Sequence, residues 1–389
     1  MNEVMRIGDI CDILNGYAFK SSKYVTDGIR VIRITNVQKG FVEDTNPQYY
    51  PVSEQREIEK YMLCEGDLLM SLTGNVGRVG LLSAEMLPAA LNQRVACIRI
   101  RNPAVIYKPF LFHLLNSDYF ENKCILASQG VAQKNMSTEW LKEYPIPSFS
   151  MDKQMEIASI FDKIDDLIAH RKDQVRNMDQ AVKSRFIELF GDIVLNPFGW
   201  EKDYLGVVCD VRDGTHDSPH YHSTGFPLVT SKNVTGGEID LTDCSLISEA
   251  DFNKINERSK VNMGDIIMPM IGTVGKPVIV NVEPNFAIKN VSLIKFKDDS
   301  RVLNTFVRSL LQSDYFDDAV LSKVRGGTQK FISLGDIRKL AVIVPPMELQ
   351  EQFAAFVEQT DKSKYYKSIQ ILKIITEAIA KEVSHDRIR

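Results

Sequence analysis

An internal duplication constrains the fold of this sequence more than any other feature. The block Leu114-Leu115-Asn116-Ser117-Asp118-Tyr119-Phe120 returns as Leu310-Leu311-Gln312-Ser313-Asp314-Tyr315-Phe316, 196 residues later in a chain of 389. A second block, Gly66-Asp67-Leu68-Leu69-Met70, returns as Gly264-Asp265-Ile266-Ile267-Met268. Self-similarity at a fixed offset is the mark of a structural unit that is built more than once.

Three further matches follow the same order along the chain. They are Asn36-Val37 with Asn233-Val234, Gly74-Asn75-Val76-Gly77-Arg78 with Gly272-Thr273-Val274-Gly275-Lys276, and Gly130, Gln133 and Lys134 with Gly326, Gln329 and Lys330. The chain is therefore a tandem duplication, and its length suits two or three domains.

Each half has the same local pattern. Short alternating runs such as Val31–Ile34 and Val95–Ile100, separated by Gly, Asn and Pro, predict strands and turns. A short helix is expected from Pro109 to Phe120, with a counterpart from Leu303 to Phe316, and each half ends in a long helical pattern. We therefore expect an α+β protein with mixed, strand-rich domains at 1–149 and 192–346, and helices at 150–191 and 347–389.

The first long helix carries an apolar stripe whose members step by four and three residues. Its apolar members include Ile157, Phe161, Ile164, Ile168, Val175, Met178, Val182 and Leu189. This spacing is typical of a coiled-coil seam. An ordinary helix packed on a domain core can show the same spacing. Arg171 and Arg185 fall on the stripe, and we expect their charged ends to extend to its edge. Gly191 then ends the helix.

The second long helix has a looser stripe that includes Phe353, Ile369, Leu372 and Ile379. The first helix delivers the chain to the second domain, and the second helix follows that domain. If the two helices pair, they must therefore run antiparallel. We expect a two-helix spacer with pseudo-two-fold symmetry between the two domains.

Composition excludes several classes of protein. The net charge is −4, so the chain as a whole is not a basic nucleic-acid binder, although a local basic face remains open. No apolar run approaches the roughly 18 residues of a membrane span, and the N-terminus does not look like a secretory signal. The six cysteines form no C-x-x-C pair, which favours reduced thiols in the cytoplasm.

Local charge indicates a DNA-binding role. Cations outnumber the single acid, Asp336, between Ala319 and Leu340; they are Lys323, Arg325, Lys330, Arg338 and Lys339. Lys134 lies in the matching segment of the first half. Lysine and arginine beside glycines can reach phosphates, and the amides of Gln133 and Gln329 match adenine in the major groove. The alternative is an ordinary solvated loop.

Two kinds of loop supply the other candidate DNA contacts. The glycine-containing turns supply Thr73, Asn75, Arg78, Thr273 and Lys276, and the start of the second domain supplies Thr215, His216 and Lys232. The glycines themselves are expected to provide positive φ in a hairpin turn. His216, Asp217, His220 and His222 could together hold zinc; Pro219 interrupts them, so we interpret the segment as a polar recognition loop without a metal.

Catalytic motifs are missing from the sequence. Neither glycine turn fits a nucleotide-binding loop. Asn46-Pro47-Gln48-Tyr49 differs at its third position from the Asn-Pro-Pro-Tyr loop of adenine methyltransferases, and we interpret it as a turn. We therefore expect no catalytic residue in this chain.

The whole chain resembles the specificity subunit of type I restriction-modification systems. The resemblance rests on the duplicated Gly-Asp-aliphatic-Met and Leu-Leu-x-Ser-Asp-Tyr-Phe blocks. It also rests on Lys183-Ser184-Arg185-Phe186-Ile187-Glu188-Leu189-Phe190-Gly191 and on Asp213-Gly214-Thr215-His216. It implies two target-recognition domains that each read half of a bipartite site in double-stranded DNA.

The resemblance also implies partners. The helices would dock methyltransferase subunits, two of them, that methylate adenine N6, and a translocating endonuclease subunit could join. S-adenosylmethionine, ATP and Mg²⁺ would then be bound by those partners and not by this chain. Two alternatives remain open: a specificity subunit of a methylation-only or two-subunit restriction system, and a coiled-coil scaffold whose domains bind proteins or glycans.

Overall fold

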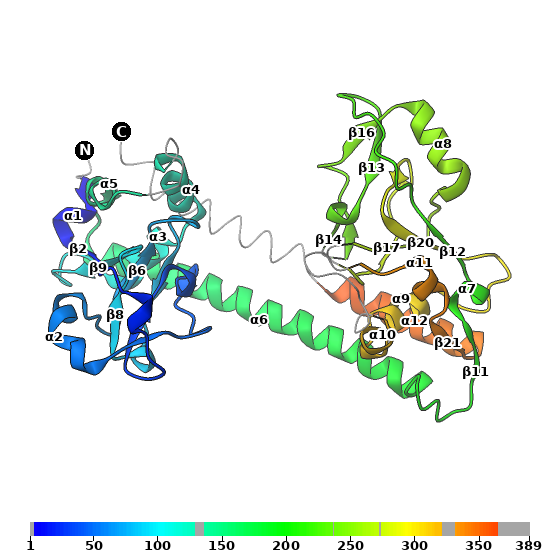
Figure 1. Ribbon diagram of the computed structural model, residues 1–389, viewed down its shortest axis with the longest axis horizontal. Helices are drawn as coiled ribbons and strands as arrows, with labels where there is room; N and C mark the ends of the chain where they lie inside the picture. The colour runs from blue at the N-terminus through cyan, green and yellow to red at the C-terminus, as the bar shows by residue number, and fades with distance from the viewer. Residues whose placement is uncertain (1–3, 129–135, 236, 272–273, 321–330, 365–389) are drawn as a thin grey trace. The chain divides into compact units, whose positions relative to one another are not determined.

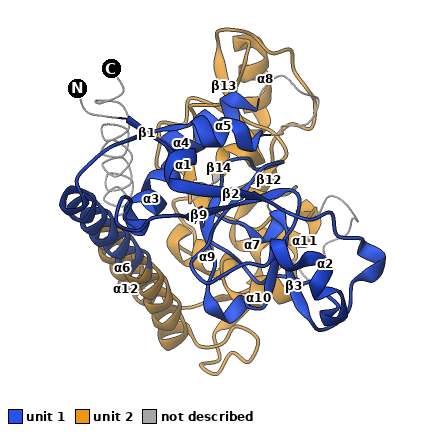
Figure 2. Cartoon of the chain, turned by 90° about the vertical axis from the view of Figure 1, so that its left-hand side faces the viewer, with its two compact units in different colours: residues 1–172, 366–389 blue, residues 173–365 orange. Residues whose placement is uncertain are grey.

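The computed structural model describes residues 4–128, 136–235, 237–271, 274–320 and 331–364. These residues form two compact units, 4–172 (the first unit) and 173–364 (the second unit), and the boundary lies inside the 40-residue helix α6 (Met151–Phe190) (Figure 1, Figure 2). Within these ranges, no helix has both the length and the apolar character needed to cross a membrane.

The first unit is built on a five-stranded sheet in the order β2-β9-β6-β7-β4, with a three-stranded sheet β5-β3-β8 and a pair β1-β10. Its strands are β1 (Val4–Arg6), β2 (Cys11–Asn15), β3 (Ile29–Ile32), β4 (Gly40–Phe41), β5 (Tyr49–Tyr50), β6 (Leu68–Ser71), β7 (Val79–Leu81), β8 (Ala89–Leu91), β9 (Val95–Ile100) and β10 (Pro145–Pro147). Strand β6 is buried along its whole length, as expected of a central strand.

The second unit repeats this plan with sheets β12-β20-β17-β18 and β16-β13-β19 and the pairs β11-β21 and β14-β15. Its strands are β11 (Glu201–Tyr204), β12 (Asp210–Asp213), β13 (Phe226–Val229), β14 (Val234–Thr235), β15 (Glu238–Ile239), β16 (Ser245–Ile247), β17 (Ile266–Pro269), β18 (Val278–Ile279), β19 (Ala287–Ile288), β20 (Val291–Lys295) and β21 (Ala341–Val344). The expected α+β fold with two strand-rich domains is confirmed.

The α-helices lie around these sheets. They are α1 (Ile7–Ile10), α2 (Gln55–Ile58), α3 (Lys108–Leu115), α4 (Asp118–Ala127), α5 (Thr138–Glu143) and α6, then α7 (Leu205–Val208), α8 (Glu249–Ser259), α9 (Asn304–Leu311), α10 (Asp314–Ala319), α11 (Leu334–Arg338) and α12 (Met347–Ser363). The expected single helix from Pro109 to Phe120 is two helices, because Ser117 caps a new one: its Oγ accepts from Phe120 N at 3.1 Å. The counterpart helix is divided likewise into α9 and α10.

The duplication extends to buried polar contacts. In the first unit the buried Asp67 carboxylate accepts from Cys64 N at 2.8 Å and from Arg99 Nε at 2.8 Å. In the second, Asp265 accepts from Asn262 N at 2.7 Å and from Lys295 Nζ at 2.6 Å. Each carboxylate therefore closes the turn before its strand and pairs with the neighbouring strand, which explains why the Gly-Asp blocks recur.

Helix α6 is buried along the predicted stripe, but the first members of the stripe lie in the core of the first unit, to which Ile157 and Phe161 belong. Ile157, Phe161 and Ile164 are buried, and the five later apolar members of the stripe, Ile168, Val175, Met178, Val182 and Leu189, are half-buried. Residues between them are mostly exposed. The helix ends at Phe190, and Gly191 follows with φ +77°, the left-handed conformation that glycine adopts after a helix end.

The end of α6 pairs with α12 inside the second unit. The Phe186 ring lies 5.5 Å from the ring of Phe353, near the start of α12, while Asp179 Oδ1 lies 3.0 Å from Lys364 Nζ, just after its end. The later residue of α6 thus contacts the earlier residue of α12, and the earlier residue of α6 contacts the later one, so the two helices run antiparallel. The remaining predicted seam residues, Ile369, Leu372 and Ile379, lie outside the described residues.

Candidate functional site

In the first unit, two loops leave the same end of the large sheet. Strands β2 and β6 both pair antiparallel with β9, and their last residues, Asn15 and Ser71, lie opposite Ala96 and Val95. The loop after β2 and the turn between β6 and β7 therefore start at the same end of the sheet, on either side of β9. The turn carries three predicted contact residues, Thr73, Asn75 and Arg78.

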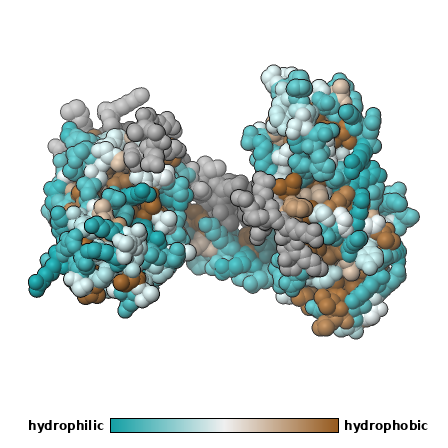
Figure 3. All heavy atoms as spheres, viewed as in Figure 1, coloured by the Kyte–Doolittle hydropathy of each residue, from teal (hydrophilic) through white to brown (hydrophobic). Residues whose placement is uncertain are grey.

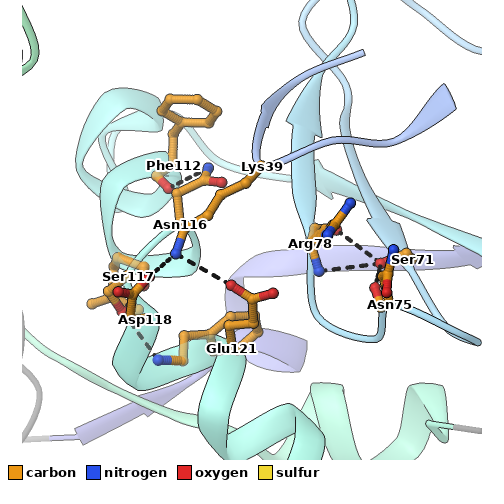
Figure 4. Close-up of polar contacts among 11 residues, drawn as sticks. Lys39, Ser71, Asn75, Arg78, Phe112, Asn116, Ser117, Asp118 and Glu121 are labelled. Atoms are coloured by element: carbon orange, nitrogen blue, oxygen red, sulfur yellow. Dashed lines mark hydrogen bonds and ion pairs between the residues drawn. The ribbon is translucent and has the colours of Figure 1, made fainter. Parts of the chain in front are cut away.

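The β6–β7 turn is held by its own backbone. Gly74 and Gly77 have φ of +67° and +88°, which confirms their expected role. Ser71 Oγ donates to the Asn75 carbonyl oxygen and accepts from Arg78 N at 3.1 Å (Figure 4). Asn75 is exposed and Thr73 is half-buried. A rigid turn thus presents polar side chains at the end of the sheet.

Two residues that sequence reasoning missed decide the local charge. Arg78 Nη1 donates to Gln38 Oε1 at 2.8 Å, and Gln38 Nε2 donates to Glu43 Oε1 at 2.9 Å. A neutral amide therefore orients the guanidinium and stands between Arg78 and the Glu43 carboxylate. The next residue, Lys39, forms ion pairs with Asp118 and Glu121 of α4, which cancel its charge (Figure 4). The signal that could have found them is their place just after Asn36-Val37, one of the duplicated blocks.

Several predicted contacts, Gln133, Lys134, Thr273, Arg325, Gln329 and Lys330, lie outside the described residues. The residues just after 129–135 and 321–330 are described, and they lie next to the glycine-containing turns at the end of each large sheet. Met136 N donates to the Leu72 carbonyl oxygen at 2.9 Å, and Ile332 N donates to that of Met270, also at 2.9 Å. Leu72 and Met270 begin the two glycine-containing turns.

The second unit repeats this arrangement with other side chains. The ends of β12 and β17, Asp213 and Pro269, lie opposite Ser292 and Val291 of β20, so the following loops again start at one end of the sheet, on either side of β20. Lys276 is exposed in the β17–β18 turn, beside Gly275 with φ +83°.

His216 is the centre of a polar network in the loop after β12. One ring nitrogen, Nε2, lies 2.9 Å from Asp213 Oδ2, and Nδ1 lies 2.9 Å from Asn290 Oδ1. Arg258 of α8 forms an ion pair with the other oxygen of the buried Asp213 carboxylate. The hydrogen bonds to Asn290 and Asp213 raise the pKa of His216, so this end of the unit holds a group that gains positive charge readily.

Thr215 and Lys232 lie near this network. Thr215 pairs with Lys289, whose backbone N donates to the Val229 carbonyl at 2.9 Å at the end of β13. Lys232 follows β13 and is exposed, and its Nζ lies 3.7 Å from Asp243 Oδ2. A pocket of about 310 Å³ adjoins Thr215 and reaches Arg258. The structure therefore brings Thr215, His216, Lys232 and Lys276 to one end of the unit.

The equivalent loop of the first unit has different chemistry. Tyr17, which pairs with Asn92 as Thr215 pairs with Lys289, donates its hydroxyl to Glu57, and this bond raises the pKa of Tyr17 to about 12. The first unit therefore has a neutral phenol at the position where the second unit has Thr215, next to His216. The two ends share one framework but offer different hydrogen-bonding groups.

The two halves match one family model. The model of the type I restriction modification DNA specificity domain matches residues 1–177 and again residues 197–376. Among curated proteins, the chain is 24% identical to the type I restriction enzyme EcoBI specificity subunit of Escherichia coli, over 90% of this chain and 77% of the relative. It is 21% identical to the EcoKI specificity subunit of Escherichia coli K12, over 91% and 80%.

Solved structures share the fold. A crystal structure of the S subunit of the type I restriction-modification system from M. genitalium aligns over 98% of this chain and 96% of its own, with a TM-score of 0.53 and 16% identity. A second structure comes from work on complex assembly and conformational transition of the type I R-M system. It aligns over 98% of this chain and 97% of its own, with a TM-score of 0.54 and 18% identity.

Proposed function

The chain belongs to the type I restriction-modification DNA specificity family, whose domain it contains twice, and from this premise we propose that each unit reads one half of a bipartite DNA site. As a member of this family it is a DNA sequence-recognition subunit. The specific proposal is that the loop ends described above contact the two half-sites.

The observation that carries this proposal is a shared framework with divergent side chains. In both units, the loop after the first strand of the large sheet and a glycine-containing turn lie at the same end of that sheet. The first unit has Tyr17 bonded to Glu57 at this end, whereas the second unit has the His216 network. Base edges are distinguished by the pattern of donors and acceptors that meets them. Two such ends therefore suit two different half-sites.

The proposal assigns catalysis to partners. The chain would direct two adenine-N6 methyltransferase subunits, and a restriction subunit where one is present, to the site, in the cytoplasm. S-adenosylmethionine, ATP and Mg²⁺ would be bound by those subunits. This chain would contribute recognition alone.

An exposed apolar surface on the second unit supports assembly with a partner. Ile187 lies in the last turn of α6, and Val194, Leu195 and Phe198 lie in the segment that follows it; each is more than half exposed. Figure 3 shows brown surface at the lower end of this unit. We call these four residues the apolar patch. Clustered apolar side chains in water mark interaction surfaces, and we assign this one to a methyltransferase subunit.

The test is to express the chain with its methyltransferase subunit in cells without other adenine methylation and to map N6-methyladenine across the genome. The expected result is one new motif of two short blocks separated by a fixed gap. An assembled complex that adds no methylation would contradict the proposal and favour a scaffold. A motif with a single block would contradict bipartite recognition.

A further inference from the structure

A buried glutamine joins the first spacer helix to the first unit. Gln154 lies in the first turn of α6 and is 0% exposed. Its Nε2 donates to the carbonyl oxygens of Val105 at 3.0 Å and Phe149 at 2.9 Å, and its Oε1 accepts from Tyr107 N at 2.8 Å. One side chain thus ties the start of the helix to the segment that leads into α3.

The second unit builds the same joint. Gln350, 196 residues later and also 0% exposed, lies in the first turn of α12. Its Nε2 donates to the carbonyl oxygens of Arg301 at 3.0 Å and Pro345 at 2.8 Å, and its Oε1 accepts from Leu303 N at 2.8 Å. The acceptors and donor match those of Gln154 one for one.

Each joint is a rigid connection. A buried amide whose donors and acceptor are all engaged fixes the groups around it, because any rotation leaves a buried polar group without a partner. About two helical turns further along α6 and about three further along α12, a second contact braces each helix. His113 of α3 lies with Nε2 2.7 Å from Asp162 Oδ1, and Arg308 of α9 lies with Nη2 3.5 Å from Asp361 Oδ2.

The direction of a long helix is sensitive to such a joint. From Gln154 to the end of α6 the helix rises about 54 Å. A tilt of about 4° at the joint displaces the far end by roughly 4 Å, more than the 3.4 Å rise of one base pair along DNA. Small angular freedom at the joint therefore corresponds to a whole step in the length of the gap.

We propose that Gln154 and Gln350 are positioning residues that set the direction in which each spacer helix starts at its unit and thereby restrict the complex to one gap length between half-sites. This inference rests on the proposed bipartite recognition. The glutamines touch no DNA; they act through the helices.

The test uses the full chain co-expressed with its methyltransferase subunit, with N6-methyladenine mapped for each variant. Gln154→Met and Gln350→Met keep the side-chain length but remove the amide, and Gln154→Glu keeps the acceptor for Tyr107 N while losing the donor. Asn36→Leu is the matched control, because Asn36 is a buried amide whose Oδ1 accepts from Arg33 N at 3.0 Å and whose Nδ2 donates to the Glu43 carbonyl at 3.2 Å, away from either helix.

The glutamine variants should keep both half-site blocks but methylate sites whose gap differs by one base pair about tenfold more than the parent chain does, the change expected when buried hydrogen bonds that enforce the gap are lost. Asn36→Leu should leave the gap unchanged, whatever its effect on overall methylation. A loss of fold alone would lower methylation at every gap equally.

Two results would overturn the inference while leaving bipartite recognition intact. One is a gap as strict in the glutamine variants as in the parent. The other is complete loss of methylation in all three glutamine variants, which would make the glutamines necessary for folding the units. A parent chain without any two-block motif would instead overturn the proposed function itself.

Discussion

At the scale of single residues, the group that each lysine or arginine contacts decides whether that side chain is available to bind DNA. Arg78 is oriented by the neutral Gln38 amide, whereas Lys39 is cancelled by Asp118 and Glu121. Counting lysines and arginines along the sequence treats the two alike. The structure separates them, so among these two we expect only Arg78 to contribute to phosphate binding.

Lys276 provides a direct test of the proposed contact surface. Replacing Lys276 with Gln should weaken DNA binding by the assembled complex and lower the slope of log K against log salt by about 0.9, the effect of one lost phosphate contact. Lys202→Gln is the control, because Lys202 lies in the separate β11–β21 pair and donates to the Val194 carbonyl at 3.1 Å. Equal slopes for the parent and Lys276→Gln would exclude this contact.

His216 should make the second unit sensitive to pH. Its pKa is raised in the folded state by the bonds to Asn290 and Asp213. Its contribution to stability is therefore complete below the unfolded-state pKa, near 6.5, and is lost as pH rises through the raised folded-state value. His216→Gln should lower the free energy of unfolding more at pH 5.5 than at pH 9. The difference should be less than about 1 kcal/mol, because the ring is largely exposed.

Urea unfolding of the second unit, measured for the parent and for His216→Gln at both pH values, checks this expectation. A difference in unfolding free energy that is the same at pH 5.5 and pH 9 would show that folding does not raise the pKa of His216.

At the scale of elements, aromatic packing anchors the end of α6 in the core of the second unit. The rings of Phe186 and Phe190 lie 5.4 Å and 4.9 Å from that of Phe306, and Phe353 of α12 lies 5.5 Å from each. All four are buried in the core of the second unit. The heptad stripe predicted from sequence does not contain Phe186 or Phe190, because it follows one face and these rings enter the domain core.

Phe353→Ala should therefore destabilise the second unit by about 3–5 kcal/mol, the usual cost of removing a buried aromatic ring. Hydrogen exchange of the amides in α9 and α12 measures the effect within this unit. Ile187→Ala, one residue after Phe186 but mostly exposed, should change it by less than about 0.5 kcal/mol. Similar losses for both variants would contradict the proposed core.

At the scale of the whole molecule, the apolar patch should govern assembly. Leu195→Asp places a charge on the patch and should reduce co-purification of the methyltransferase subunit at least about tenfold, since a buried unpaired charge costs several kcal/mol. Val207→Asp is the control, because Val207 is also more than half exposed in the second unit but lies outside the patch, in α7. Unchanged co-purification with Leu195→Asp would place the partner elsewhere.

Much of this protein follows from its sequence alone. The duplicated blocks, the glycine positions and the stripe on α6 predict two α+β domains, their turns and the spacer helices, because backbone conformation and hydrophobic periodicity are local properties of the chain. The resemblance to specificity subunits depends on the same blocks. Gly191 at the end of α6 and the positive φ of Gly74 and Gly77 are examples that the structure confirms.

Other features were decided only by tertiary structure. Gln38 beside Arg78, Arg258 beside Asp213, and Gln154 beside Tyr107 are separated by about 40 residues or more, and nothing in the spacing of the chain brings them together. Hydrogen bonds and ion pairs depend on distances of a few tenths of an ångström between side chains from different elements. Local pattern therefore determines which elements form, while packing determines which charges remain available and how the start of each helix is joined to its unit.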